Sequence, residues 1–341
     1  MGSRTELTAL LISLLSSAAL VLSVPAAAAN FLIYDDFDDN EIDHSLWTAY
    51  KSDPGPIVSE SNQTLEIVYP AESDGEVFGA GYDGLCELSG DFDIQVDYRP
   101  PVWPPANGVR VALVTTFGSV ERTSFGKSPD FPDQPREVYL TNFGDVVSGI
   151  TGTTHLSGKL RQVRSGNTVS GYYLSDGSWV LIHTAQATTN NAAFSLSSWS
   201  HDYAFSDEAV QATFDNMIVN EGILVCPPIE VSIDVKPGDQ PNSLQPNSNG
   251  RIPVAILTTD SFAANSVDPS TVLFGPTGTE ASSAQSALED VDGDGDTDLI
   301  LHFRTQDAAI HCGDTTLLLV GTTSTGRVVV GSDYVTTVGC K

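Results

Sequence analysis

The sequence predicts an all-β protein, with one β-sandwich followed by a second, smaller β-sandwich. From about residue 31 onward, short runs of alternating apolar and polar side chains recur, which is the pattern of strands that place one face on a core. Gly, Pro, Asn and Asp residues separate these runs, and the chain lacks the apolar period typical of helices. Many short strands joined by such turns are typical of sandwiches and barrels.

The strand pattern divides the chain into two parts. Residues 63–69, 92–98 and 109–114 are clear alternating runs of the first part, and Cys226-Pro227-Pro228 then interrupts the pattern. The later runs are rich in Val, Ile, Leu and Thr and predict the smaller sandwich. The expected organisation is a signal peptide over residues 1–29, a first domain over 30–222, a Pro-containing linker over 223–229 and a second domain over 230–341.

The first 29 residues have the composition of a secretory signal peptide. Arg4 precedes an apolar core over residues 7–24, and four alanines end the segment at Ala29, where we expect cleavage. No later apolar stretch approaches the length of about 20 residues that spans a bilayer. We therefore expect a secreted, extracellular protein without membrane insertion.

The composition narrows the range of partners. At 341 residues the chain has room for about two domains, each with its own core. It carries 44 acidic and 15 basic residues, a formal net charge of -29. Such a surface disfavours nucleic acid and anionic membranes as partners. The sequence leaves the oligomeric state open.

Four cysteines fit an oxidising location, and their spacing is not that of a zinc or redox motif. Cys312 and Cys340 lie in the same predicted domain, so we expect them to form a disulfide bond. Four cysteines allow three pairings, and the bond between Cys86 and Cys226 follows only by elimination. A bond there would tie the linker to the first domain.

Five aspartates at alternate positions form the most distinctive motif of the chain, between Glu289 and Leu299. Closely spaced carboxylates repel one another, and hard oxygen ligands suit Ca²⁺. Gly293 and Gly295 supply the backbone freedom that a tight cage of ligands needs. The spacing predicts a calcium site with these ligands: Asp290, Asp292, Asp294, the backbone carbonyl of Asp296, and Asp298.

The segment after the aspartates reads as a strand, and Leu301 stands where a helix-loop-helix sensor would have its last glutamate. The motif therefore resembles the D-x-D-x-D-G-x-x-D calcium loops that integrin-type propeller blades carry on β-hairpins. A structural site is expected, because there is no helix pair to open. The alternative is an acidic, solvated turn without metal.

Three segments of the first part are similar to concanavalin A-like lectin and glucanase domains. They are the opening Tyr34 to Asp43 with Leu46-Trp47, the paired runs at 160–173 and 176–179, and the closing run at 212–219. The resemblance implies a jelly-roll sandwich, a fold that serves lectins, hydrolases, adhesins and structural modules. It also suggests a second metal site between Asp36 and Asp215. Residues 230–341 resemble a C-terminal module of secreted bacterial proteins that has no function we can assign.

Catalytic motifs are not apparent. Glycoside hydrolysis needs two carboxylates across a cleft, and the glucanases of this fold carry theirs on one strand as E-x-D-x-x-E, a motif that this chain lacks. Asp91, Asp93 and Gln95 share one strand face, which we interpret as a polar face turned to water. Neither a nucleophile motif nor a phosphate-binding loop occurs.

Sugar binding usually needs an aromatic platform beside polar side chains. Trp103 and Trp199 have polar or rigid surroundings in the sequence and are the candidate ligand-binding residues, whereas Trp47 and Trp179 are assigned to packing. The alternative is that all four tryptophans are core. The predicted function is non-catalytic binding of a polysaccharide, cell-surface glycan or other surface ligand, with Ca²⁺ as a structural cofactor. One alternative is a structural or adhesive surface protein, and another is a glycoside hydrolase or lyase with an unrecognised acid pair.

Overall fold

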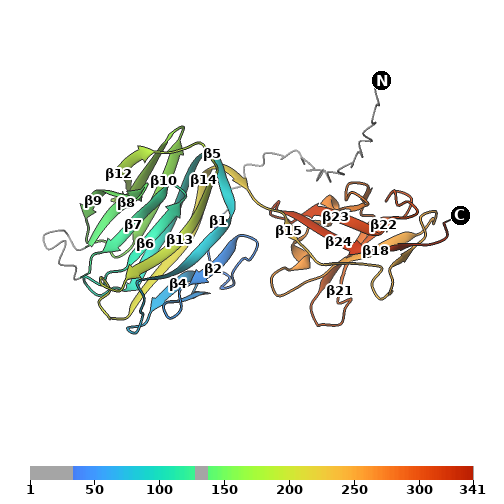
Figure 1. Cartoon of the computed structure of the whole chain (residues 1–341), viewed down its shortest axis with the longest axis horizontal. Coiled ribbons are helices and arrows are strands. Elements are labelled where there is room, and N and C mark those ends of the chain that lie inside the picture. Colours follow the sequence, from blue (N-terminus) through green and yellow to red (C-terminus); the bar gives the residue numbers. More distant parts are fainter. Residues whose placement is uncertain (1–33, 127–136, 341) are drawn as a thin grey trace, which may run out of the picture.

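A computed structural model describes residues 34–126 and 137–340 of the chain. The predicted signal peptide lies outside these residues. The described chain folds into two β-rich bodies placed end to end, and it passes from one to the other once, between β14 and β15 (Figure 1). The predicted fold class, a jelly-roll sandwich followed by a smaller sandwich, is confirmed. No described helix is long and apolar enough to cross a membrane.

The N-terminal sandwich contains the first fourteen described strands. They are β1 (Tyr34–Asp35), β2 (Trp47–Lys51), β3 (Ile57–Ser61), β4 (Thr64–Tyr69), β5 (Val77–Val102), β6 (Arg110–Thr115), β7 (Gly118–Ser124), β8 (Glu137–Phe143), β9 (Val146–Gly152), β10 (Gly158–Ser165), β11 (Thr168–Ser175), β12 (Ser178–Gln186), β13 (Ala192–His201) and β14 (Val210–Val225).

The long strand β5 joins the two layers of this sandwich. Its residues 77–88 pair with β13, and its residues 92–98 pair with β10. Layer A contains β2, the first part of β5, β13, β6, β7, β8 and β9. Layer B contains β3, β4, β14, the second part of β5, β10, β11 and β12, with β1 paired to β14.

The core lies between the layers, where alternate residues of each strand point inward. In β4, for example, Leu65, Ile67 and Tyr69 are fully buried while the residues between them are only partly covered. Tyr98 of layer B reaches Tyr139 of layer A, with hydroxyl oxygens 2.5 Å apart. Burial of side chains of this size contributes about 1.5–3 kcal/mol each, which explains why the alternating pattern specifies the sandwich.

The C-terminal sandwich repeats this construction on a smaller scale. One layer has the order β15-β24-β23-β19-β20, the other has the order β16-β18-β22-β21, and β17 pairs with β25. Phe274 of β19 and Phe303 of β22 meet in the core with ring centroids 4.9 Å apart. The elements are β15 (Ile229–Glu230), β16 (Ile233–Val235), β17 (Ser243–Leu244), β18 (Arg251–Ile256), the short 3-10 helices η1 (Ala264–Ser266) and η2 (Pro269–Thr271), β19 (Leu273–Gly275), β20 (Ala281–Ser282), β21 (Gln285–Glu289), β22 (Asp298–Arg304), β23 (Thr316–Thr322), β24 (Val328–Tyr334) and β25 (Thr336–Thr337).

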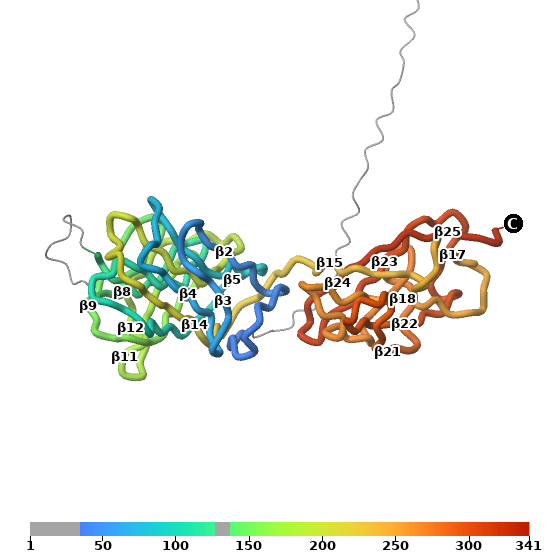
Figure 2. Tube along the Cα trace, turned by 90° about the horizontal axis from the view of Figure 1, so that it is seen from below, coloured from blue at the N-terminus to red at the C-terminus, as the bar shows by residue number. Residues whose placement is uncertain are grey.

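The connection between the sandwiches is shorter than the linker expected over 223–229. β14 keeps its pairing with β5 up to Val225, and β15 begins at Ile229. Only residues 226–228 lie outside strands, and the tube in Figure 2 passes directly from β14 into β15.

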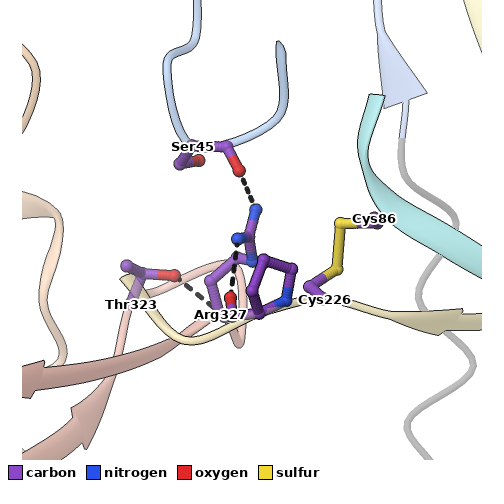
Figure 3. The surroundings of a disulfide bond; sticks show 6 residues. Ser45, Cys86, Cys226, Thr323 and Arg327 are labelled. Carbon is purple, nitrogen blue, oxygen red and sulfur yellow. Dashed lines mark hydrogen bonds between the residues drawn. A yellow bond between two sulfur atoms is a disulfide. The ribbon is translucent and has the colours of Figure 1, made fainter. Parts of the chain in front are cut away.

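A disulfide bond and an arginine hold this joint (Figure 3). Cys86 of β5 is bonded to Cys226, the residue that follows β14. Arg327, from the turn before β24, is only 7% exposed and donates hydrogen bonds to the carbonyl oxygens of Ser45 and Pro227. One guanidinium thus connects the C-terminal sandwich both to the connection and to the N-terminal sandwich. The second disulfide bond, between Cys312 and Cys340, lies within the C-terminal sandwich.

Candidate functional site

The predicted calcium ligands lie in the turn that connects β21 to β22. The side chains of Asp290, Asp292 and Asp294 are exposed, and each offers a carboxylate oxygen within 4.8 Å of the other two. Gly293 and Gly295 have positive φ angles of 81° and 101°, a conformation that side chains disfavour, so the turn depends on these glycines.

Loop amides already hold these carboxylates in place. Asp290 accepts hydrogen bonds from the amides of Gly293 and Gly295, and Asp292 accepts one from the amide of Asp294. The pKa of Asp292 is raised by desolvation within the loop and by the charges of Asp294 and Asp298. The loop therefore holds like charges together, and a cation placed among them would relieve their repulsion.

The remaining two predicted ligands lie outside this group of three. Asp298 is fully buried, and its two carboxylate oxygens accept hydrogen bonds from the amides of Thr258 and Val291. Its carboxylate therefore braces the start of β22 against the neighbouring strand. Asp296 is exposed, and the sequence assigned only its carbonyl oxygen to the metal. Because three carboxylates converge in an all-oxygen loop, the donor set suits a hard cation such as Ca²⁺.

A second candidate site is a cavity of about 470 Å³ at one end of the N-terminal sandwich, where β8 and β9 of layer A meet β11 of layer B. Its volume is in the range of small-molecule sites. The lining combines one carboxylate, one imidazole, one phenol and several hydroxyls: Glu137, Gly152, Thr153, Thr154, His155, Tyr173 and Ser175.

Glu137 forms one wall of this pocket and is fully engaged by neighbours. Its Oε1 accepts from the Ser124 hydroxyl and the Ala106 amide. Its Oε2 accepts from the Trp103 indole at 2.9 Å and forms an ion pair with buried Arg122 at 2.7 Å. The carboxylate is thus a fixed acceptor whose two oxygens are engaged by four partners.

Trp103, predicted to be a sugar platform, lies outside the pocket lining and contacts the lining residue Glu137. Its indole N–H is used by Glu137, and the Arg122 guanidinium lies 5.5 Å from its ring centroid. The ring is half-buried and is absent from the pocket lining. The aromatic ring that lines the pocket is Tyr173, whose ring is stacked on Tyr139 with centroids 4.1 Å apart.

A chain of hydrogen bonds leads from the core to His155 in the pocket. Arg122 interacts with the Tyr98 hydroxyl and opposes the rise that burial causes in the pKa of Tyr98. The Tyr98 and Tyr139 hydroxyls are in contact, and the Tyr139 hydroxyl lies 3.1 Å from Nδ1 of His155. These contacts link the core to the pocket and hold the imidazole ring of His155 at the pocket wall.

Trp199, the other predicted platform residue, lies on the outer surface of layer A and not in the pocket. It is half-buried and pairs across strands with Arg110, whose guanidinium is 6.0 Å from the ring centroid. Arg110 in turn lies 3.8 Å from the carboxylate of Glu121, which accepts hydrogen bonds from Ser119 and Thr123. The structure therefore places Trp103 and Trp199 in separate side-chain clusters.

The outer surface of layer B carries the strand face that the sequence had marked as polar. Asp93 forms a two-point ion pair with Arg161 and accepts a hydrogen bond from Asn220, which also donates to Gln95. Arg161 lies 5.1 Å from the ring of Trp179, which is half-buried there, whereas Trp47 is 2% exposed in the core. The assignment to packing holds for Trp47, and Trp179 instead packs against a surface arginine.

The pocket could not be recognised in the sequence. Glu137, His155 and Tyr173 come from three separate segments, and each stands alone in its segment without a motif. Sequence analysis did single out Trp103, whose indole donates a hydrogen bond to Glu137 of the pocket. For the predicted metal pair of Asp36 and Asp215, burial and the charges of Asp97, Asp38 and Asp36 raise the pKa of Asp215, so Asp36 lies within electrostatic reach of Asp215.

Comparisons with known proteins find similarity only at the level of structure. No protein-family model matches the chain, and no curated protein matches it at a significant level. Solved structures resemble it over 55–57% of its length and 98–99% of theirs: a lichenase from a mouse hindgut metagenome (13% identity, TM-score 0.40), the LamA catalytic domain of Zobellia galactanivorans (12%, 0.41) and an alginate lyase of Klebsiella pneumoniae (10%, 0.39). At this level of similarity they decide nothing about the site, and the function proposed below depends on the side chains alone.

Proposed function

We propose that this protein binds carbohydrate in the pocket at the end of its N-terminal sandwich. The observation that carries the proposal is the lining of the 470 Å³ cavity, which joins an aromatic ring, Tyr173, to hydroxyls and oriented polar groups. A ring face matches the apolar face of a pyranose, and the hydroxyls of Thr153, Thr154 and Ser175 can both donate to and accept from sugar hydroxyls. A polysaccharide or cell-surface glycan is the proposed partner.

The number and the contacts of the carboxylates in the pocket favour sugar binding over sugar hydrolysis. A glycosidase uses two carboxylates about 5–9.5 Å apart, one of them as a proton donor or base. Among the described lining residues Glu137 is the only acid, and it is engaged by four partners. This supports a site that recognises a sugar without cleaving it.

Calcium belongs to the proposal as a structural cofactor of the C-terminal sandwich. Three carboxylates of the loop converge, and the loop connects two paired strands, Glu289 lying opposite Asp298. Such a hairpin has no helix pair to open, so an ion here stabilises the turn and does not act as a switch. Two disulfide bonds support the expectation of a secreted, extracellular protein, because such bonds persist in oxidising compartments.

The test is a glycan array probed with the whole chain, together with two matched variants. We expect binding to a defined group of glycans, and we expect His155→Ala to weaken it by about tenfold, equivalent to about 1.4 kcal/mol. His183→Ala, on β12 and outside the pocket lining, should bind like the wild type. Circular dichroism would verify that both variants fold.

The outcomes separate the proposal from its rivals. Failure of the wild type to bind any glycan would leave the structural or adhesive interpretation. Equal weakening by His155→Ala and His183→Ala would exclude the pocket as the site. New reducing ends or unsaturated sugars in the bound glycans would indicate a hydrolase or a lyase.

A further inference from the structure

Two arginines lie directly opposite each other on the outer surface of the C-terminal sandwich. Arg251 of β18 pairs with Arg304 of β22, and both are exposed, whereas the next pair along the strands, Ile252 and Phe303, is buried in the core. Directly opposite side chains of antiparallel strands have Cβ atoms about 5 Å apart, and like charges in such a pair are destabilising. The fold therefore holds two positive charges side by side on one face.

Carboxylates do not neutralise these arginines. None of the ion pairs in the described part of the chain includes Arg251 or Arg304. Arg251 donates a hydrogen bond to the side-chain oxygen of Gln285, which is a neutral acceptor. The other two basic residues of this sandwich that the structure describes are used elsewhere, since Lys236 forms an ion pair and Arg327 holds the joint.

The acidic loop of the same sandwich lies at the far end of β22. This strand has Asp298 at its start and Arg304 at its end, which are about 20 Å apart at the usual rise of a strand. Exposed charges separated by more than about 10 Å are largely screened at 0.1 M salt. The two arginines therefore form a local positive patch on a chain whose formal net charge is -29.

A cavity of about 370 Å³ opens at these arginines, a volume in the range of small-molecule sites. The amide and the hydroxyl of Thr305 both donate to the carbonyl oxygen of Gly250 at 3.2 Å, and the Gln306 side chain donates to that of Asn249. These contacts tie the two segments of the cavity wall together, so the cavity is preformed. Its lining contains two guanidinium groups, two side-chain amides and one carboxylate: Asn249, Gly250, Arg251, Arg304, Gln306 and Asp307.

We propose that this cavity binds a uronic acid, an acidic sugar, with the sugar carboxylate held between Arg251 and Arg304. The planar guanidinium group matches a carboxylate with two parallel hydrogen bonds. The exposed carboxylate of Asp307 can only accept hydrogen bonds, which the hydroxyls of a sugar donate. A bare sulfate ion has no such donor and is repelled by Asp307. The lining therefore suits a ligand that carries both an anionic group and hydroxyls.

This site belongs to the other sandwich and is independent of the proposed carbohydrate pocket that contains His155. The experiment uses the whole chain with isotope-labelled arginine side chains in calcium-free buffer. Trigalacturonate, added at constant ionic strength, should shift the Nε–H resonances of Arg251 and Arg304 until they saturate. Each resonance is assigned by its loss in the corresponding glutamine variant. The neutral trisaccharide of galactose with the same linkage should leave both resonances in place.

Arg304→Gln should raise the dissociation constant at least tenfold, measured from the remaining resonance of Arg251. The matched control is Arg99→Gln, which removes an exposed arginine from β5 with the same change in net charge and should bind like the wild type. His155→Ala should also leave the two arginine shifts unchanged. Arg304 and Arg99 are exposed, so both variants are expected to fold, which circular dichroism would verify.

Two results would overturn the site itself: no shift of these resonances with trigalacturonate, or equal dissociation constants for Arg304→Gln and the wild type. An equal shift with the neutral trisaccharide would overturn the role of the carboxylate. Sulfate that binds as tightly as trigalacturonate would overturn the assignment to a sugar and leave a site for small inorganic anions. None of these results would affect the carbohydrate-binding proposal, which is read from the glycan array and His155→Ala.

Discussion

The two acidic clusters of this molecule use the same chemical groups under opposite conditions. In the C-terminal loop, Asp290 and Asp292 are exposed and accept hydrogen bonds from loop amides. In the N-terminal sandwich, Glu60 of β3 is buried, neither of its oxygens has a hydrogen-bond donor, and the charges of Asp35, Asp39 and Asp43 act on it. Local spacing assembles the first cluster, whereas the folding of distant segments assembles the second. Whether a group of acids can be recognised in the sequence is therefore independent of how much the group destabilises the folded protein.

Solvent exposure explains the difference in cost. Two unit charges about 4 Å apart repel by about 1 kcal/mol in water and by about 4 kcal/mol at the effective dielectric near a protein surface. The exposed loop aspartates interact nearly as charges in water do, whereas the surroundings of Glu60 have the lower effective dielectric. Repulsion between acids should therefore cost more around Glu60 than within the loop.

The largest expected effect is the loss of calcium stabilisation from the loop. Asp292→Ala should lower the free energy of unfolding of the C-terminal sandwich by up to about 2.7 kcal/mol when free calcium is about 100 times the dissociation constant. Without calcium the variant and the wild type should unfold alike. Calorimetry with and without a chelator measures both cases, and an unchanged melting temperature in calcium would remove the metal from this loop.

A somewhat smaller effect of opposite sign is expected at Glu60. Burial and the charges of nearby acids raise the pKa of Glu60 to about 8, so the folded chain must bury the charged form only above that pH. Glu60→Gln should therefore stabilise the N-terminal sandwich by about 1–3 kcal/mol above pH 8 and by less at lower pH. Tryptophan fluorescence during denaturant unfolding reports on this sandwich alone, because all four tryptophans belong to it. The matched control is Glu66→Gln, on the adjacent strand β4, where Asn62 donates a hydrogen bond to the carboxylate. A loss of stability in Glu60→Gln relative to this control would mean that the Glu60 carboxylate has a stabilising partner in the folded chain.

The sequence predicted those features that depend on local pattern. Alternation identified strands such as β4 and β6, and the spacing of the aspartates located the turn in which Asp290, Asp292 and Asp294 converge. The disulfide bonds also follow the expected pairing. The pocket could not be predicted in this way, because His155 and Tyr173 become neighbours only through the stacking of layer A on layer B.

The burial of Glu60 and Glu121 could not be predicted from the sequence, for a related reason. Glu60 stands in the polar run Ser59-Glu60-Ser61 and reads as a solvent-exposed residue of a strand. Glu121 stands between Val120 and Arg122 and reads the same way, yet it is 2% exposed. Which face of a strand is covered depends on the packing of other segments, and that information is not local.

The smallest expected effect is at Glu121. This residue is buried but has hydrogen-bond partners, so its comparison with Glu60 distinguishes the effect of burial from the effect of missing partners. It is more deeply buried than Glu60, at 2% exposed against 9%, but it accepts hydrogen bonds from Ser119 and Thr123 and lies beside Arg110. Burial raises its pKa above the usual 4.5, against the opposing effect of Arg110 and the two hydroxyls. The folded state therefore holds this proton more tightly than the unfolded state, and the associated stability is present below pH 4.5 and is lost as the pH rises through the raised pKa.

Glu121→Gln should remove this dependence on pH. The stability of the variant relative to the wild type should therefore increase as the pH rises above 4.5, by an amount smaller than the change at Glu60 because donors already surround the carboxylate. Denaturant unfolding at a series of pH values, followed by tryptophan fluorescence, measures the difference. A relative stability that does not change with pH would mean that the hydroxyls and Arg110 fully offset burial, and that lack of donors, not burial, sets the cost at Glu60.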